Sequence, residues 1–319
     1  MTAPTSCFVA YPSAPASHAE SIEHAIQEIN NGGVVDIIGW KSLAVGGRVL
    51  IETICEQIRS RDLFIADVTT LNPNVLFELG YAIAHRKRVW LVLDPNIEKS
   101  KVDFDRFQLL TTVGYCSYSN SHEITAGFYR EAPYEKLDQV LYDELISSGA
   151  TGAKRDALLY LKSQVNTEAT IRIARKVASG PLKSVIDDPT EVRVQPLSWY
   201  AQQVNSSFAV VCHLLSTDYQ NWELFNAKHA LIAGLAHGQS KPLLMLGHEA
   251  YVSPIDYRDL LRIHRTASAA EAIFNEWLLP LIEQYEKRRT YGLQYEAEAR
   301  AKGELRNIEI GRASCRERV

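Results

Sequence analysis

Short apolar runs alternate with helical repeats along the first 130 residues of the chain. Continuous runs such as FVAY and VWLVL are typical of strands buried on both faces of a parallel sheet. Between them, apolar residues recur every three or four positions, which predicts amphipathic helices. The predicted strands are residues 6–11, 34–38, 63–68, 89–93 and 113–117, and the predicted helices are 17–31, 49–59, 73–85 and 121–130. This alternation predicts an α/β fold, a flavodoxin-like doubly wound parallel sheet with strand order 2-1-3-4-5.

The pattern changes after residue 130 and then returns. Spaced apolar residues in 131–180 predict a mostly helical connector. Beyond it, residues 191–197, 208–215 and 242–246 are predicted strands, and 198–204, 222–237 and 271–289 are predicted helices. The second part of the chain therefore has the same α/β character as the first.

The two halves also share one local pattern. NVLFELGYAIAHRKRVWLVL and NAKHALIAGLAHGQSKPLLML both run from a helix, through a histidine and a basic residue, into a strand. We interpret them as a diverged internal repeat; the alternative is that any helix-to-strand turn in an α/β protein looks similar. Aligning the turns places Ala230 opposite Glu78. We expect two tandem related domains, 1–130 and a degenerate Rossmann-like repeat at 181–290, separated by the connector and followed by a tail, 291–319.

Composition narrows the class of protein. The 319 residues correspond to about two domains, and 46% hydrophobic with 23% charged residues is ordinary for a soluble globular protein. A net charge of −4 without a basic block argues against a broad nucleic-acid surface. No apolar run approaches the ~18 residues of a membrane span, and the N-terminus lacks a signal-peptide pattern. Five scattered cysteines without CxxC spacing favour a reducing, cytoplasmic setting and no zinc site.

The last eleven residues, EIGRASCRERV, differ in character from the rest of the chain. They resemble the translation of a common sequencing adapter, and we expect them to be an assembly artefact. The alternative is a genuine basic tail.

Polar residues follow the first and third predicted strands. In a doubly wound sheet, ligands bind at the carboxyl ends of the strands where the strand order reverses, here between these two strands. Tyr11, Pro12 and Ser13 follow the first strand, and residues 67–72 end the third. Asn72 is a good N-cap, and the helix it starts would direct its N-terminal amides towards an anion.

One acidic side chain interrupts the helix predicted at 73–85. The buried stripe of this helix consists of Val75, Leu79, Ala82 and Ile83. Glu78 lies on the neighbouring stripe, so we expect it to be partly desolvated, with a raised pKa. The alternative is a solvated glutamate on the flank of the helix.

The string D-x-T-x-x-N-P-N-V-x-x-E-L-G-Y-A, from Asp67 to Ala82, resembles nucleoside 2-deoxyribosyltransferase-like proteins and their TIR-like relatives in bacterial defence. The resemblance covers roughly residues 5–130. It implies that Glu78 is the nucleophile at the anomeric carbon of a nucleoside sugar. Pro73-Asn74 stands where the transferases usually carry a Gly-Thr pair, which leaves room for hydrolysis of an N-glycoside or of NAD.

The resulting hypothesis is a nucleotide N-glycosidase that acts as an antiviral defence effector. A carboxylate can stabilise or trap the positive charge that develops on ribose when the bond to the base breaks. Asp67 and Asn72 would hold ribose hydroxyls, and Tyr11 or Trp40 would stack on the base. The expected substrate-binding residues are Tyr11, Pro12, Ser13, Trp40, Asp67, Thr69, Asn72, Asn74 and Tyr81. For two of these residues the alternative is a structural role: Asp67 could accept hydrogen bonds from its own loop, and Trp40 could pack in the core.

We expect no metal and no cofactor; NAD or another nucleotide enters as the substrate. The second half offers only His213, Asp218 and His237 as weak polar candidates, and we expect it to bind, pair with or regulate the first. In the transferases a neighbouring subunit completes each site, so a homodimer or a defence-system partner protein is also expected. The alternative functions are a non-enzymatic nucleotide-binding sensor or regulatory module, and a scaffold with a vestigial pocket.

Overall fold

The computed structural model describes residues 4–43, 49–147, 157–189, 195–251 and 257–301. The chain divides into two compact units, Met1–Glu271 and Ala272–Val319. Both sheets and all the sites discussed below belong to the first unit. Within the described residues, no helix is long and apolar enough to cross a membrane. The eleven residues at the end of the chain lie outside the described residues.

The first sheet is the predicted doubly wound sheet. Its five strands are all parallel and follow the order β2-β1-β3-β4-β5. The strands are β1 (Thr5–Ala10), β2 (Val35–Gly39), β3 (Leu63–Asp67), β4 (Arg88–Leu93) and β5 (Cys116–Ser117). The helices of this part are α1 (Ala16–Asn31), α2 (Leu50–Ser60), α3 (Pro73–Ala84), α4 (Ser100–Phe107), α5 (Ser121–Glu131) and α6 (Leu141–Ser147), with short 3-10 turns η1 (Trp40–Ser42) and η2 (Pro133–Glu135). The fold class is therefore confirmed for this half.

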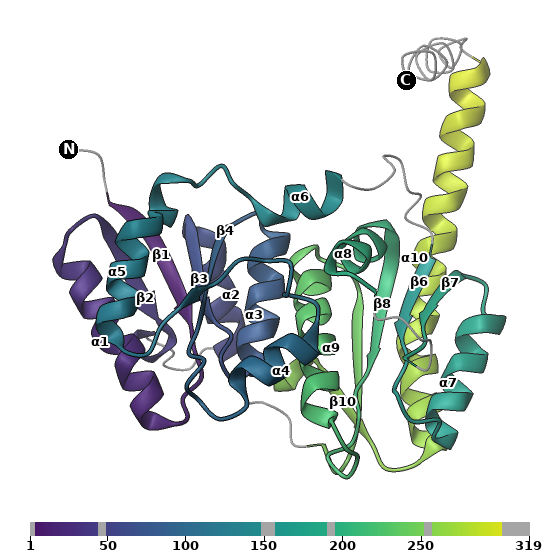
Figure 1. Ribbon diagram of the computed structural model, residues 1–319. Helices are drawn as coiled ribbons and strands as arrows, with labels where there is room; N and C mark the ends of the chain where they lie inside the picture. Colours follow the sequence, from purple (N-terminus) through teal and green to yellow (C-terminus); the bar gives the residue numbers. More distant parts are fainter. Residues whose placement is uncertain (1–3, 44–48, 148–156, 190–194, 252–256, 302–319) are drawn as a thin grey trace. The chain divides into compact units, whose positions relative to one another are not determined.

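Helices cover both faces of this sheet (Figure 1). Side chains alternate along a strand, so Cys7 and Val9 of β1 join the core under α1 and α5, whereas Phe8 and Ala10 join the core under α2 and α3. Burial on both faces is the reason that β1 and β3 have continuous apolar runs.

The second sheet has the same topology as the first. Its parallel strands follow the order β10-β9-β8-β6-β7, so that β6 takes the place of β1 and β8 that of β3. The strands are β6 (Ala157–Leu161), β7 (Lys183–Asp187), β8 (Ser207–His213), β9 (Leu243–His248) and β10 (Leu261–His264). The helices are α7 (Glu168–Ser179), α8 (Leu197–Ser206), α9 (Trp222–Gly238) and α10 (Ala267–Ala301), with a 3-10 turn η3 (Arg258–Leu260).

The predicted connector at 131–180 is wrong, because it contains β6, an interior strand of the second sheet, and helix α7. A buried strand such as ALLYL is too short for its periodicity to be told from that of a buried helix. The strand predicted at 191–197 is also wrong where it can be followed, since α8 begins at Leu197; residues 191–194 lie outside the described part. The edge strand β7 was missed because KSVID has polar ends and is only half-buried.

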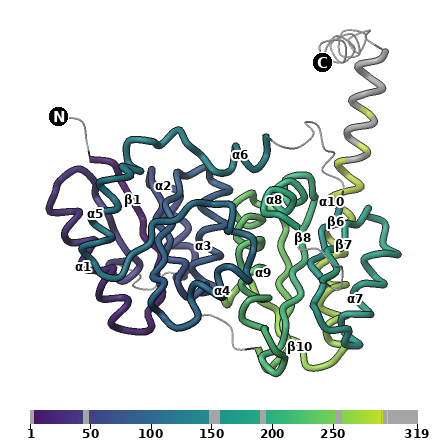
Figure 2. The backbone as a smooth tube through the Cα atoms, in the orientation of Figure 1, coloured from purple at the N-terminus to yellow at the C-terminus, as the bar shows by residue number. Residues whose placement is uncertain are grey.

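Helices α3 and α9 pack side by side through a glycine on each (Figures 1 and 2). A Cβ built on Gly80 would lie 2.1 Å from Leu231 O, and one built on Gly234 would lie 2.0 Å from Phe77 O. The backbones of the two helices are therefore in direct contact, as only glycine permits. This contact merges the apolar residues of both sheets into one core.

The shared topology corrects the alignment of the two halves. Each helix ends in the same turn, with a positive φ of 57° at Arg86 and 53° at Ser240. Counting back from this turn makes Gly80 equivalent to Gly234 and places Ile232, not Ala230, opposite Glu78. The alignment from sequence was two residues off because the AH pairs it matched lie at different distances from the turn.

Candidate functional site

Helix α3 begins as the sequence predicted. The Oδ1 atom of Asn72 accepts hydrogen bonds from the backbone N–H groups of Asn74 at 2.9 Å and Val75 at 3.4 Å. Pro73 occupies the first turn, where no N–H is needed. The cap fixes the start of α3 just beyond the carboxyl end of β3.

Glu78 is buried in the middle of α3. Its exposed fraction is 4%, and ionisable side chains are rarely so buried unless they are paired. Burial, followed by the negative charge of Glu78, raises the pKa of Cys55 on α2 to about 12, so the carboxylate lies near that thiol. The predicted desolvation of Glu78 is therefore confirmed, and the alternative of a solvated flank residue is not.

Asn74 lies one helical turn before Glu78 and contributes a second buried polar group. Its Oδ1 atom is inaccessible to solvent and has no hydrogen-bond partner within the described part of the chain. An unpaired buried acceptor costs ~1–3 kcal/mol. Such a group indicates a position where a donor from a ligand or a water molecule belongs. Residues at i and i+4 share one face of a helix, so Asn74 and Glu78 together present an acceptor and an acid.

Tyr81 lies further along α3, at its junction with α2 and α9. Its ring is 4.4 Å from the ring of His85 and 5.6 Å from that of His237, measured between centroids. Burial, followed by the neighbouring Cys55, raises the pKa of Tyr81 to about 12. Seven residues of helix, ~10 Å, separate Tyr81 from Asn74. The structure therefore places Tyr81 and His237 in helix packing, away from the edge of the sheet.

Asp67, at the end of β3, is bound by the protein on both oxygens. Its Oδ1 accepts from the backbone N–H of Thr69 at 3.2 Å and from Nε2 of His18 at 3.1 Å. Its Oδ2 accepts from the hydroxyl of Tyr118 at 2.5 Å and from that of Thr69 at 3.1 Å. The Asp67 carboxylate is therefore buried, and the protein itself supplies hydrogen bonds to both of its oxygens. This geometry agrees with the alternative in which Asp67 binds its own loop, and the role in holding ribose stays a prediction.

Sequence reasoning missed His18 and Tyr118 in this network. The two residues are 100 positions apart, one in the first turn of α1 and one after β5. Burial lowers the pKa of His18, but its hydrogen bond to Asp67 and the charges of Asp67 and Asp94 outweigh burial and leave that pKa raised. No local motif marks such a contact, because only the sheet brings the two residues together.

Tyr11 and Trp40 pack against each other. Their ring centroids are 6.0 Å apart, and the indole N–H of Trp40 donates to the backbone oxygen of Tyr11 at 3.1 Å. The Tyr11 hydroxyl donates to Glu23 at 3.1 Å. Pro12 is buried and Ser13 is exposed. These residues therefore lie together at the end of β1, but the polar atoms of both aromatic side chains already form hydrogen bonds within the protein.

The two sheets place different side chains at three equivalent edge positions. The first sheet has Asp67, Asp94 and Tyr118, and by strand register the second has His213, His248 and His264. In the first set Tyr118 donates a hydrogen bond to Asp67, whereas the histidines of the second set line an open pocket of about 390 Å³. Asp218 lines the same pocket as His213. At the position equivalent to Glu78 the second half has Ile232.

The second half also fills the place that corresponds to Asn74. Lys228 stands there, and its Nζ lies 2.8 Å from Oδ2 of Asp187 and 3.0 Å from the hydroxyl of Tyr200. This ion pair is nearly buried and internally satisfied. The chemistry expected of α3 is therefore not duplicated on α9.

No protein-family model matches the chain, and no curated protein matches it either. Among the described residues, no group of three or more His, Cys, Asp or Glu side chains is arranged to hold a metal ion.

Proposed function

We propose that the chain cleaves the N-glycosidic bond of a nucleotide or nucleoside, NAD included, with Glu78 as the catalytic carboxylate. The observation that carries the proposal is the burial of Glu78 at 4% exposure on a helix whose other central residues are apolar. The resemblance of residues 67–82 to the transferase and TIR-like motif supports the same residue.

The surroundings of Glu78 suit this chemistry. Breaking the bond between base and ribose leaves positive charge on the sugar, which a desolvated carboxylate stabilises or captures as a covalent intermediate. In hydrolysis, water then attacks the anomeric carbon and releases the sugar. Asn74 offers an unpaired buried acceptor one turn away, suited to a ribose hydroxyl. The high pKa of Cys55, about 12, keeps that thiol protonated and unsuited to act as the nucleophile.

The test is base release by the purified chain. NAD, nucleosides and deoxynucleosides are incubated with the wild type, with Glu78→Gln and with Glu52→Gln, and the free base is measured by chromatography. Glu52 is a matched control, because it is an exposed acid on the neighbouring helix α2. We expect Glu78→Gln to lose roughly 10²–10⁴-fold in rate and Glu52→Gln to match the wild type. If none of the substrates is cleaved, or if Glu78→Gln is as active as the wild type, the proposal fails.

A nucleotide-binding module without turnover is the second candidate. It is favoured by the open pocket of the second half, which lies at the ligand-binding edge of its sheet. Tight binding of a nucleotide with no release of base would support it over the enzyme.

The proposed N-glycosidase would suit the role of a defence effector. This role is proposed from the resemblance to TIR-like proteins alone.

A further inference from the structure

The second sheet carries an open cavity at its carboxyl edge. It has a volume of about 390 Å³ and lies where the ends of β6, β8, β9 and β10 meet the first turns of α7 and α10. Small-molecule sites in proteins have volumes of ~300–1,000 Å³. This is the position at which doubly wound sheets bind ligands; at the equivalent position of the first sheet, Asp67 is hydrogen-bonded to His18 and Tyr118.

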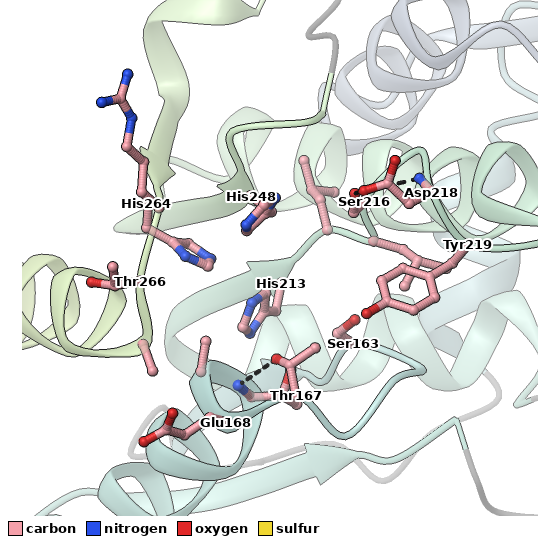
Figure 3. Close-up of a pocket in the computed structure, with 16 residues that line it drawn as sticks. Ser163, Thr167, Glu168, His213, Ser216, Asp218, Tyr219, His248, His264 and Thr266 are labelled. Atoms are coloured by element: carbon pink, nitrogen blue, oxygen red, sulfur yellow. Dashed lines mark hydrogen bonds between the residues drawn. The ribbon is translucent and has the colours of Figure 1, made fainter.

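Three histidines converge in this cavity (Figure 3). The ring centroid of His264 is 5.7 Å from that of His213 and 5.8 Å from that of His248. His264 is only 4% exposed, yet neither of its ring nitrogens has a hydrogen-bond partner among the described residues. A backbone acceptor of Thr266 lies close enough to oppose the fall in the pKa of His264, although its geometry is not that of a hydrogen bond. A buried imidazole of this kind offers a donor to a ligand.

Two helix N-termini face the same cavity. Thr167 caps α7 by accepting from the amide of Thr170, and Thr266 caps α10 by accepting from that of Ala269. Both residues line the cavity, and the remaining first-turn amides of the two helices have no partner inside their own helix. Helix N-termini favour anions, and phosphate most often.

The charged groups that line the cavity are compatible with a bound anion. Burial lowers the pKa of His213 to about 3, and burial with the neighbouring His248 lowers that of His264, so His213 and His264 are neutral when the cavity is empty. Two acids line the cavity: Glu168 pairs with Arg172, and Asp218 accepts from the hydroxyl of Ser216, which lines the cavity beside it. Arg265 lines the rim and pairs with Glu249.

We propose that this cavity binds a small phosphate-bearing molecule of the nucleoside phosphate class. The phosphate lies between His264 and the N-termini of α7 and α10, and the remainder of the molecule extends towards Tyr219, whose hydroxyl points into the cavity in Figure 3. A metal ion is the other ligand that histidines suggest, but no metal-binding arrangement exists among the described residues. The site is independent of Glu78 and does not require the proposed enzyme activity.

Calorimetry on the full chain tests the site. All titrations use Glu78→Gln as background, so that no nucleotide is consumed and failure of the N-glycosidase proposal does not affect the result. The probes are inorganic phosphate, AMP, ADP and adenosine. We expect AMP or ADP to bind at least about tenfold more tightly than adenosine, a difference of ~1.4 kcal/mol. Binding of inorganic phosphate alone, with AMP no tighter, would reduce the proposal to an anion site and contradict the nucleotide class.

Two variants locate the binding. His264→Gln removes the unpaired imidazole, and we expect it to weaken AMP binding at least tenfold. His24→Gln, an exposed histidine of α1, is the matched control and should bind as the background does. Arg265→Glu repeats the test at an exposed position that cannot disturb the core, and it should also weaken binding. The proposal would be overturned if adenosine bound as tightly as AMP or if no probe bound. It would also be overturned if both His264→Gln and Arg265→Glu bound AMP as tightly as the background protein.

Discussion

Gly234→Ala should destabilise the protein through the contact between α3 and α9. The new Cβ would lie 2.0 Å from Phe77 O and 2.8 Å from the carbonyl carbon of Phe77. Ordinary van der Waals contact begins at 3.4 Å, which is 1.4 Å more than 2.0 Å, so the two backbones have to move apart. Neither obstacle is a flexible side chain that could turn away.

The expected magnitude follows from two opposing effects. Alanine is ~1 kcal/mol better than glycine inside a helix, so without a clash the substitution would stabilise. Overpacking costs ~1–3 kcal/mol, and a gap of up to ~1 Å forfeits a quarter to a half of each dispersion contact it opens. Because the clash is with backbone, we take the upper end and expect a net loss of about 2 kcal/mol in the free energy of unfolding.

Urea unfolding followed by circular dichroism measures this loss. Gly114→Ala is the control, because its Cβ would meet nothing within 4 Å, and we expect a change of no more than ~0.5 kcal/mol. Phe77 adjoins Glu78, so the displaced helix should also lower any base-release activity; a misplacement of ~1 Å can cost 10²-fold. If Gly234→Ala is as stable as Gly114→Ala or more so, the inference of backbone contact between the helices is refuted.

Two further predictions concern the network at the end of β3. Tyr118→Phe removes a hydrogen bond to the buried Asp67 carboxylate and should cost ~1.5–3 kcal/mol in urea unfolding; a change below the error of the fit would show that the bond contributes nothing. The pKa of His18 is raised in the folded chain, so protonated His18 stabilises the fold. This contribution to the free energy of unfolding is fully present at a pH below the unfolded-state pKa, ~6.5, and is lost as the pH rises through the folded-state pKa. The stability difference between wild type and His18→Gln should therefore be larger near pH ~5.5 than near pH ~8, and a difference independent of pH would contradict the assignment.

Several features of the candidate site could be predicted because they are local. The cap at Asn72, the proline that follows it and the burial of Glu78 depend on residues within a few positions of one another, and all three are observed. Periodicity fails where the signal is short: β6 has five residues, and its apolar run fits a helix as well as a strand. The internal repeat was visible in sequence, but its register required the matching turns at Arg86 and Ser240.

The sequence by itself determined that the chain forms parallel sheets with helices on both faces. The continuous apolar runs specify strands that are buried on both sides, and the apolar stripes specify helices that are buried on one side. Only the tertiary structure decided which polar groups meet at the sheet edges. His18 reaches Asp67 across 49 positions, and His213, His248 and His264 end three different strands. No local pattern shows such contacts, since they depend on the order of the strands in each sheet. The two edges differ because equivalent strands end in different side chains: Asp67 and its hydrogen-bonded partners stand at one edge, and three histidines line the pocket at the other.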